Sequence, residues 1–235
     1  MKASASEHSI LLIGAGRLAK NLFHWNSLLS TPNVIKTWNR NEDPKILKQF
    51  LNESAVIWLA ITDSAIAHFF DQHLRNYEGT VVHFSGALHD SRMQCAHPLM
   101  TFPKELMPYS TYQQIHFAVT GATTLNKILP GFTNPFFLLP EKEKPLYHAL
   151  CVVAGNFPQL LWNEIEQKRK TLKIPETAFN IYLQQALNNF IKYKASALTG
   201  PLIRNDLETM NKNIEALANT KLQSIYAAFV KEFLL

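Results

Sequence analysis

The sequence predicts an α/β fold, a doubly wound parallel sheet followed by an all-helical region. Three observations lead to this prediction. Short apolar runs of strand length alternate with amphipathic helical patterns through residues 9–86. A glycine-rich turn joins the first strand to the first helix. After Pro140, glycine becomes rare and helix-forming residues dominate to the end of the chain.

The first turn carries the spacing G-x-G-x-x-A, in Gly14, Gly16 and Ala19, between an apolar strand over 10–13 and a helix. This order of elements is the context that a dinucleotide-binding fingerprint requires. Gly14 would permit the tight turn, and Gly16 would let a pyrophosphate approach the backbone at the helix start. The alternative is a turn whose glycines serve only the backbone. The cofactor contacts expected here are Gly14, Ala15, Gly16, Arg17 and Leu18.

The second strand, residues 34–38, ends in Trp38-Asn39-Arg40. NAD-binding folds usually place a carboxylate at this tip to hold the ribose 2′-hydroxyl. Here the tip has an arginine, whose guanidinium can bind a 2′-phosphate through charge-assisted hydrogen bonds. The sequence therefore favours NADP, with Asn39 and Arg40 as contacts, over the alternative of a solvated turn residue.

A helix is expected to begin at Asp43-Pro44, since aspartate is a good N-cap and proline suits the first helical position. Apolar runs at 55–61 and 80–84 read as buried strands, with a helix between them that starts after Thr62. Ligands of such sheets bind at the carboxyl ends of the strands. The expected rim contacts are Ile61, Thr62, Asp63, Ser85 and Gly86.

The alternation weakens between residues 87 and 140. Strands are expected at 115–119 and 135–139, with a short helix over 123–129 between them, all extending the same sheet. We place the domain boundary after this part, which gives an NADP-binding domain at 1–140 and a helical substrate and dimerisation domain at 141–235.

The helical region is expected to begin near Lys144-Pro145, and Pro158 should interrupt its first helix near Gly155-Asn156. Further helices should begin at Pro175, at Asn205 or Asp206, and at Thr220. Apolar residues surround more than one face of two of these helices, which favours a homodimer formed through this region. They are Ile181, Tyr182, Leu183, Ala186, Leu187, Phe190 and Ile191, and Ile225, Tyr226, Ala227, Phe229 and Val230.

Composition excludes several classes of protein. The chain has 235 residues, of which 47% are hydrophobic and 17% charged, as in ordinary globular proteins. Its net charge of +5 comes from scattered residues, so we expect an anionic small molecule rather than nucleic acid. No apolar run is long enough for a membrane helix, and no signal peptide is expected. The two cysteines cannot form a metal site, so we expect no metal, reduced thiols and a cytoplasmic location.

Seven motifs together resemble one bacterial family of Rossmann-like proteins with a helical C-terminal domain of unknown function. They are Gly14-Ala-Gly-Arg-Leu, Trp38-Asn-Arg, Leu59-Ala-Ile-Thr-Asp, Val82-His-Phe-Ser-Gly-Ala-Leu, His97-Pro-Leu-Met-Thr-Phe, Lys144-Pro-Leu-Tyr-His-Ala and Ala197-Leu-Thr-Gly-Pro-Leu-Ile-Arg-Asn-Asp. Members are often labelled NADP oxidoreductases and lie beside pyrroline-5-carboxylate reductase in the 6-phosphogluconate dehydrogenase-like group. The resemblance implies a C-terminal domain like that of 6-phosphogluconate dehydrogenase. The chain departs from the family in the shorter segment between Gly86 and His97, and in Asn156-Phe157-Pro158.

Hydride transfer requires positioning and a proton source. The candidate catalytic residues are His148, His97, Lys144 and Asn156. Lys144 and His148 share a helix face and match a family motif, although they could be ordinary polar residues at a helix start. The resemblance adds Tyr147, Thr199 and Arg204 as substrate contacts, and Arg204 could instead pair with Asp206 or Glu208. We expect His148, or failing that His97, to be the acid, and Lys144 or Arg204 to hold a substrate anion.

Two functions fit these features. The first is an NADP-dependent oxidoreductase that transfers hydride to or from a small, anionic substrate bound between the domains. The second is a regulatory or interaction protein that binds NADP(H) without turnover. Only the first requires a proton donor beside the nicotinamide.

Overall fold

The computed structural model describes residues 9–234 and confirms the predicted α/β class. A seven-stranded sheet has the order β2-β1-β3-β4-β5-β6-β7. Its strands are β1 Ser9–Ile13, β2 Val34–Trp38, β3 Val56–Leu59, β4 Thr80–His83, β5 Gln94–Pro98, β6 Phe117–Thr120 and β7 Phe136–Leu138. All neighbouring pairs are parallel except β5 and β6, which are antiparallel.

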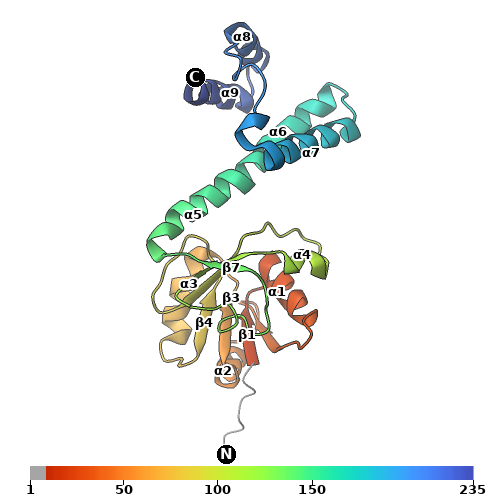
Figure 1. Cartoon of the computed structure of the whole chain (residues 1–235). Helices are drawn as coiled ribbons and strands as arrows, with labels where there is room; N and C mark the ends of the chain where they lie inside the picture. Colours follow the sequence, from red (N-terminus) through yellow and green to blue (C-terminus); the bar gives the residue numbers. More distant parts are fainter. Residues whose placement is uncertain (1–8, 235) are drawn as a thin grey trace, which may run out of the picture. The chain divides into compact units, whose positions relative to one another are not determined.

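The sheet is covered on both faces, as the apolar strand sequences predict (Figure 1). Along β1, Ile10 and Leu12 face one core while Leu11 and Ile13 face the other, because side chains alternate along a strand. The first core lies under α1 (Arg17–Ser27) and α4 (Tyr109–Gln113). The second lies under α2 (Pro44–Glu53) and α3 (Asp63–Phe69), which continues as a π-helical turn over Phe70–Leu74.

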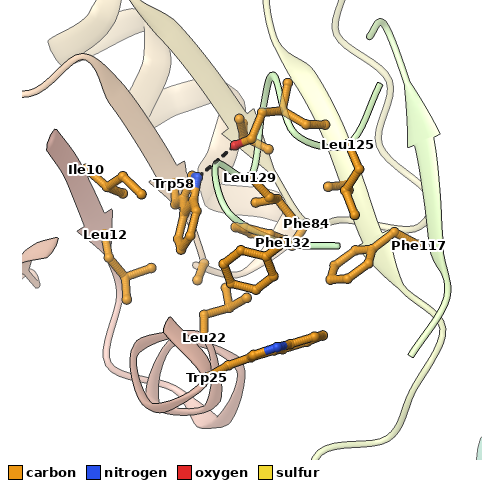
Figure 2. Close-up of a cluster of buried hydrophobic side chains, with 14 of the residues drawn as sticks. Ile10, Leu12, Leu22, Trp25, Trp58, Phe84, Phe117, Leu125, Leu129 and Phe132 are labelled. Carbon is orange, nitrogen blue, oxygen red and sulfur yellow. Dashed lines mark hydrogen bonds between the residues drawn. The ribbon is translucent and has the colours of Figure 1, made fainter. Parts of the chain in front are cut away.

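Aromatic rings fill the first core (Figure 2). Trp25 of α1 stacks on Tyr112 of α4, with ring centroids 4.8 Å apart. Trp58 of β3 is fully buried and meets Phe132 edge to face. The indole Nε1 of Trp58 donates a hydrogen bond of 3.0 Å to the carbonyl of Ile128, shown dashed in Figure 2. The buried polar atom of this tryptophan is therefore satisfied.

The predicted helix over residues 123–129 is wrong. Leu125 accepts hydrogen bonds from the amides of Ile128 and Leu129, at 3.0 and 2.8 Å, and the segment forms turns only. The amide of Gly131 then bonds to the side chain of Asn126 at 2.9 Å. The apolar spacing that suggested a helix serves instead to bury Leu125, Ile128 and Leu129 in the first core. Two elements, β5 and α4, were not predicted.

The structure divides into two compact units, of which the first ends at residue 153 and the second begins at residue 154. The first unit includes the sheet, a 3₁₀ turn at Glu141–Glu143 and α5 (Lys144–Cys151). The division therefore falls after α5 rather than near residue 140. The functional domains proposed from the sequence, 1–140 and 141–235, stay a prediction.

A π-helical turn, Val152–Asn156, follows α5 where Pro158 was expected to interrupt the helix. The second unit then contains α6 (Phe157–Thr171), α7 (Glu176–Tyr193), a 3₁₀ turn (Lys194–Ala197), α8 (Leu207–Ala216) and α9 (Lys221–Phe233). Asp206 caps α8 by accepting a hydrogen bond of 3.0 Å from the amide of Thr209. None of the helices in residues 9–234 is both long enough and apolar enough to span a membrane.

Candidate functional site

The glycine turn after β1 has the geometry that the fingerprint predicts for its first position. Gly14 adopts a φ of +128°, and a Cβ added there would lie 2.2 Å from the carbonyl oxygen of Ala60. Its amide donates a 2.9 Å hydrogen bond to the carbonyl of Trp38. Gly14 therefore permits the close approach of the turn to the end of β3, as only glycine can.

Gly16 is different, because the packing of the chain does not require a glycine there. Its φ is −73°, and a Cβ at this position would have no atom within 4 Å. It is the N-cap of α1, with no side-chain capping bond and no acidic residue in the first helical turn. The start of α1 is thus exposed, beside a residue without a side chain. This arrangement fits a phosphate group.

The end of β2 presents Arg40 to solvent. Trp38 is buried, and its indole donates to the carbonyl of Asp43 at 3.2 Å. Asn39 accepts a bond from the amide of Asn41 at 3.1 Å and donates to Glu42. Within residues 9–234 the guanidinium of Arg40 makes no hydrogen bond or ion pair. The turn is held by its neighbours, which leaves Arg40 available for an anion.

The ends of β3 and β4 are joined through Asp63 and Ser85. Asp63 is the first residue of α3, after Thr62 as N-cap. The hydroxyl of Ser85 donates to Asp63 at 2.6 Å and accepts from the amide of Leu88 at 2.9 Å. These bonds fix the loop after β4 at the carboxyl edge of the parallel strands, where the sequence placed the rim contacts.

Lys144, the first residue of α5, is buried, with 1% of its surface exposed. Its Nζ donates to the carbonyl of Ser85 and to Sγ of Cys95, both at 3.0 Å. Burial raises the pKa of the Cys95 thiol, and the Lys144 ammonium opposes this shift. The ammonium therefore bonds to the loop after β4, through Ser85, and to β5, through Cys95. Two hydrogen bonds of Lys144 are thus made within the protein, and the expectation that it holds a substrate anion stays a prediction.

His97, Tyr147 and His148 meet beside Gly86. Nδ1 of His97 lies 2.8 Å from the Tyr147 hydroxyl, and the rings of His97 and His148 have centroids 6.3 Å apart. A Cβ at position 86 would lie 2.6 Å from Cδ2 of His148 and 3.0 Å from Nε2 of His97. The absence of a side chain at Gly86 therefore allows both imidazoles to approach the loop after β4.

The electrostatics of this cluster favour neutral side chains. Burial lowers the pKa of His97 to about 4, with further lowering by Lys144 and His148 and an opposing effect of Asp63. Burial also raises the pKa of Tyr147, with a contribution from Cys151. At neutral pH, His97 is then a neutral imidazole and Tyr147 a neutral phenol. His97 is poorly suited to the predicted role of second-choice acid, because it does not carry the proton to be delivered.

His83, the last residue of β4, belongs to the same rim and was missed in the sequence. It is buried, and its Nδ1 accepts a 3.3 Å hydrogen bond from the amide of Ser85. Burial lowers its pKa to about 4, and Lys144 lowers it further. Two signals were available: its position at the end of a buried strand, just before Ser85, and its place in the motif Val82-His-Phe-Ser-Gly-Ala-Leu.

Three of the predicted site residues lie in the second unit. Asn156 ends the π-helical turn before α6, and Thr199 and Arg204 lie in the segment before α8; all three are exposed. The amide of Arg204 donates to the carbonyl of Gly200 at 3.3 Å. Asp206 bonds to Thr209, and no ion pair of Arg204 with Asp206 or Glu208 occurs in the described residues. Their roles in substrate binding stay predictions. Residues 9–234 contain no group of three or more side chains that could hold a metal ion.

Solved structures share this fold. A Bacteroides fragilis protein named as a candidate NADP oxidoreductase is 18% identical, with a TM-score of 0.77 over 96% of this chain and 97% of that chain. Protein TM1727 from Thermotoga maritima is 20% identical, with a TM-score of 0.66 over 94% and 95%. Pyrroline carboxylate reductase from Plasmodium falciparum, crystallised with NADP, is 12% identical, with a TM-score of 0.59 over 95% and 94%. At these identities the likeness establishes a shared Rossmann-like fold.

No curated protein matches the sequence. A family model described as a domain of unknown function, DUF2520, matches residues 115–233, just over half of the chain. This is the family type that the seven motifs predicted, a helical domain without an assigned activity behind a nucleotide-binding fold. The chain therefore belongs to the DUF2520 family.

Proposed function

We propose that the protein is an NADP-dependent oxidoreductase that transfers hydride to or from a small substrate. The observation that carries the proposal is the open start of α1 at Gly16, where the chain's own packing does not account for a glycine. Gly14, Ala15, Gly16, Arg17 and Leu18 would bind the pyrophosphate there. The names of the Bacteroides fragilis and Plasmodium falciparum proteins are consistent with this proposal.

The remaining cofactor contacts follow the carboxyl edge of the sheet. Arg40 would hold a 2′-phosphate, with Asn39 beside it, since no carboxylate ends β2. Toward the other end of the edge, the contacts proposed are Ile61, Thr62, Asp63, Ser85 and Gly86. When bound, NADP would supply the hydride chemistry, and the side chains would orient the substrate and move a proton.

His148 is the proposed acid. It stands beside Gly86 and His97 and is only partly buried, so that it can exchange a proton with solvent. An imidazole suits proton transfer near neutral pH. Lys144 would position Ser85 rather than contact the substrate. Arg204 and Thr199 stay candidates for binding an anionic substrate, and Asn156 stays a catalytic candidate.

Calorimetry and turnover test the proposal in two steps. The full chain should bind NADPH. Its His148→Gln variant should bind NADPH equally well, but it should not turn over small carboxylic acids that carry a carbonyl or imine group. His116→Gln, an exposed histidine on the loop before β6, is the matched control and should keep both properties. A chain that binds no NADPH would refute the proposal. Tight binding without turnover across such a panel would favour a regulatory NADP(H)-binding protein.

A further inference from the structure

We infer that the substrate presents a carbonyl oxygen, or in the reverse direction a hydroxyl, to Nε2 of His97, so that the reaction interconverts a carbonyl and an alcohol and does not reduce an imine. The inference rests on the proposed function and names its substrate class. It starts from the contact of His97 with Tyr147 beside Gly86.

The hydrogen bond to Tyr147 selects one tautomer of His97. The hydroxyl oxygen and Nδ1 are 2.8 Å apart. A neutral phenol donates well and its oxygen accepts weakly, whereas an unprotonated imidazole nitrogen is a strong acceptor. Tyr147 therefore donates, Nδ1 accepts, and the ring proton of His97 resides on Nε2. The raised pKa of Tyr147 keeps the phenol protonated at neutral pH.

Nε2 of His97 is then an N–H donor aimed at the loop after β4. It lies 3.0 Å from the point where a Cβ of residue 86 would stand, so the ring reaches this loop only because residue 86 has no side chain. Within residues 9–234, the hydrogen bond of the His97 ring is made through Nδ1 alone. This N–H has no acceptor within the described residues, and an oxygen atom of a ligand would accept its hydrogen bond.

The surrounding charges favour an oxygen that becomes negative. The Lys144 ammonium is near enough to lower the pKa values of both His97 and His83. The carboxylate of Asp63 opposes it, but that group accepts a hydrogen bond from Ser85. A neutral N–H donor with a buried cation behind it stabilises a developing oxyanion. An iminium substrate would instead bring a positive charge toward the same cation.

The reaction balances with these groups alone and NADPH. In the reducing direction, NADPH when bound would supply a hydride, a proton with two electrons, to the carbonyl carbon. The π electron pair of the C=O bond moves to oxygen, which takes a proton from His148 and ultimately from water. The carbonyl is reduced to an alcohol and NADPH is oxidised to NADP⁺. His97 keeps its proton throughout and contributes only the hydrogen bond, as a neutral imidazole does in other enzymes that polarise carbonyls.

The tautomer can be tested without knowing the substrate. Long-range ¹H–¹⁵N spectra of the full chain should show His97 as a neutral ring protonated on Nε2 from pH 6 to 8. In Tyr147→Phe, a larger share of the Nδ1-protonated form should appear. A wild-type ring protonated on Nδ1, or on both nitrogens at pH 7, would overturn the inference.

Turnover tests the substrate class directly. NADPH oxidation should occur with members of a carbonyl panel of pyruvate, glyoxylate and succinic semialdehyde, and not with 1-pyrroline-2-carboxylate or 1-piperideine-2-carboxylate. His97→Ala should lower kcat for the carbonyl substrate by roughly 100- to 1,000-fold with little change in KM. His97→Gln, which places an amide N–H near the same point, should recover part of the loss.

Calorimetric NADPH binding separates the two proposals. If NADPH binds and the cyclic imines are the better substrates, or neither panel is turned over, the substrate class is wrong while cofactor binding stands. If NADPH does not bind, the proposed function has failed before the substrate class is tested. His116→Gln serves again as the control for a histidine substitution outside the cluster.

Discussion

The carbonyl oxygen of Ala60, at the end of β3, lies so close to Gly14 that a single added methyl group would stand 2.2 Å from it. Two strands of the sheet, β1 and β3, are thus brought together at their carboxyl ends by one residue without a side chain. The second glycine of the same turn, Gly16, has no such neighbour. We therefore expect the two glycines to have separable roles, one in folding and one in binding.

We expect Gly14→Ala to lower the free energy of unfolding by roughly 2–5 kcal/mol, because it combines a strained φ with a backbone clash. Gly16→Ala should lower that free energy by less, roughly 0.5–1.5 kcal/mol, because alanine is a poorer N-cap than glycine, while weakening NADPH binding at least about tenfold. Urea unfolding and calorimetry measure the two effects. A Gly16→Ala protein that binds NADPH as tightly as the wild type would contradict the cofactor site.

Arg40 should determine the preference for NADPH over NADH. A charge-assisted hydrogen bond contributes about 1.5–3 kcal/mol, and about 1.4 kcal/mol corresponds to a tenfold change in affinity. Arg40→Ala should then weaken NADPH binding roughly 10- to 100-fold and leave NADH binding nearly unchanged. Arg75→Ala, at an exposed arginine before β4, is the control. Equal losses for both cofactors would remove Arg40 from the site.

The stability of the fold should depend on pH through His83. Its pKa is about 4 in the folded chain, chiefly because of burial, and near 6.5 when unfolded. Between these values the unfolded chain binds a proton that the folded chain does not. The contribution of His83 to the free energy of unfolding is therefore fully present above about pH 6.5, and it decreases as the pH falls toward 4.

A matched pair of variants isolates this contribution. His83→Gln should show a smaller loss of stability between pH 7.5 and pH 5 than the wild type, measured by urea unfolding at both values. His116→Gln, on an exposed loop, should lose as much as the wild type. If His83→Gln and the wild type respond identically to pH, His83 does not titrate as its burial requires.

We also expect a homodimer formed through the helical unit. Ile181, Leu187 and Ile191 of α7 are 69%, 51% and 57% exposed in the chain, and such large apolar surfaces are usually covered by a partner. Light scattering should give twice the mass of one chain at micromolar concentration. Leu187→Glu should give the monomer mass, while Gln184→Glu, also on α7, should not. A monomeric wild type would contradict this expectation.

Strands that are buried on both faces could be predicted from the sequence with little ambiguity. Residues 10–13 and 56–59 are unbroken apolar runs, and their burial requires nothing further along the chain. β5 could not be predicted, because Gln94-Cys-Ala-His-Pro98 has no periodic pattern. Its strand conformation depends on pairing with β4 on one side and β6 on the other. Such long-range pairing leaves no local signal.

The sequence predicted several residues of the candidate site, but it did not predict their burial or their protonation states. The motifs brought Gly86, His97, Tyr147 and His148 forward as candidates, and the structure groups them. The sequence offered no reason to expect a buried lysine, since lysine is almost always exposed. The burial of Lys144 beside Ser85 and Cys95 is what changes its proposed role, and its charge contributes to the neutrality of His97.

The family match begins at residue 115, inside the sheet, so that β6 and β7 fall within it while β1 to β5 precede it. The edge of β6 that pairs with β5 would be left open in a polypeptide cut at that point. Exposed strand edges recruit other chains and aggregate. The recognisable family segment is therefore not an exchangeable module. A cut at its boundary would divide one sheet between two polypeptides, with β1 to β5 in one and β6 and β7 in the other.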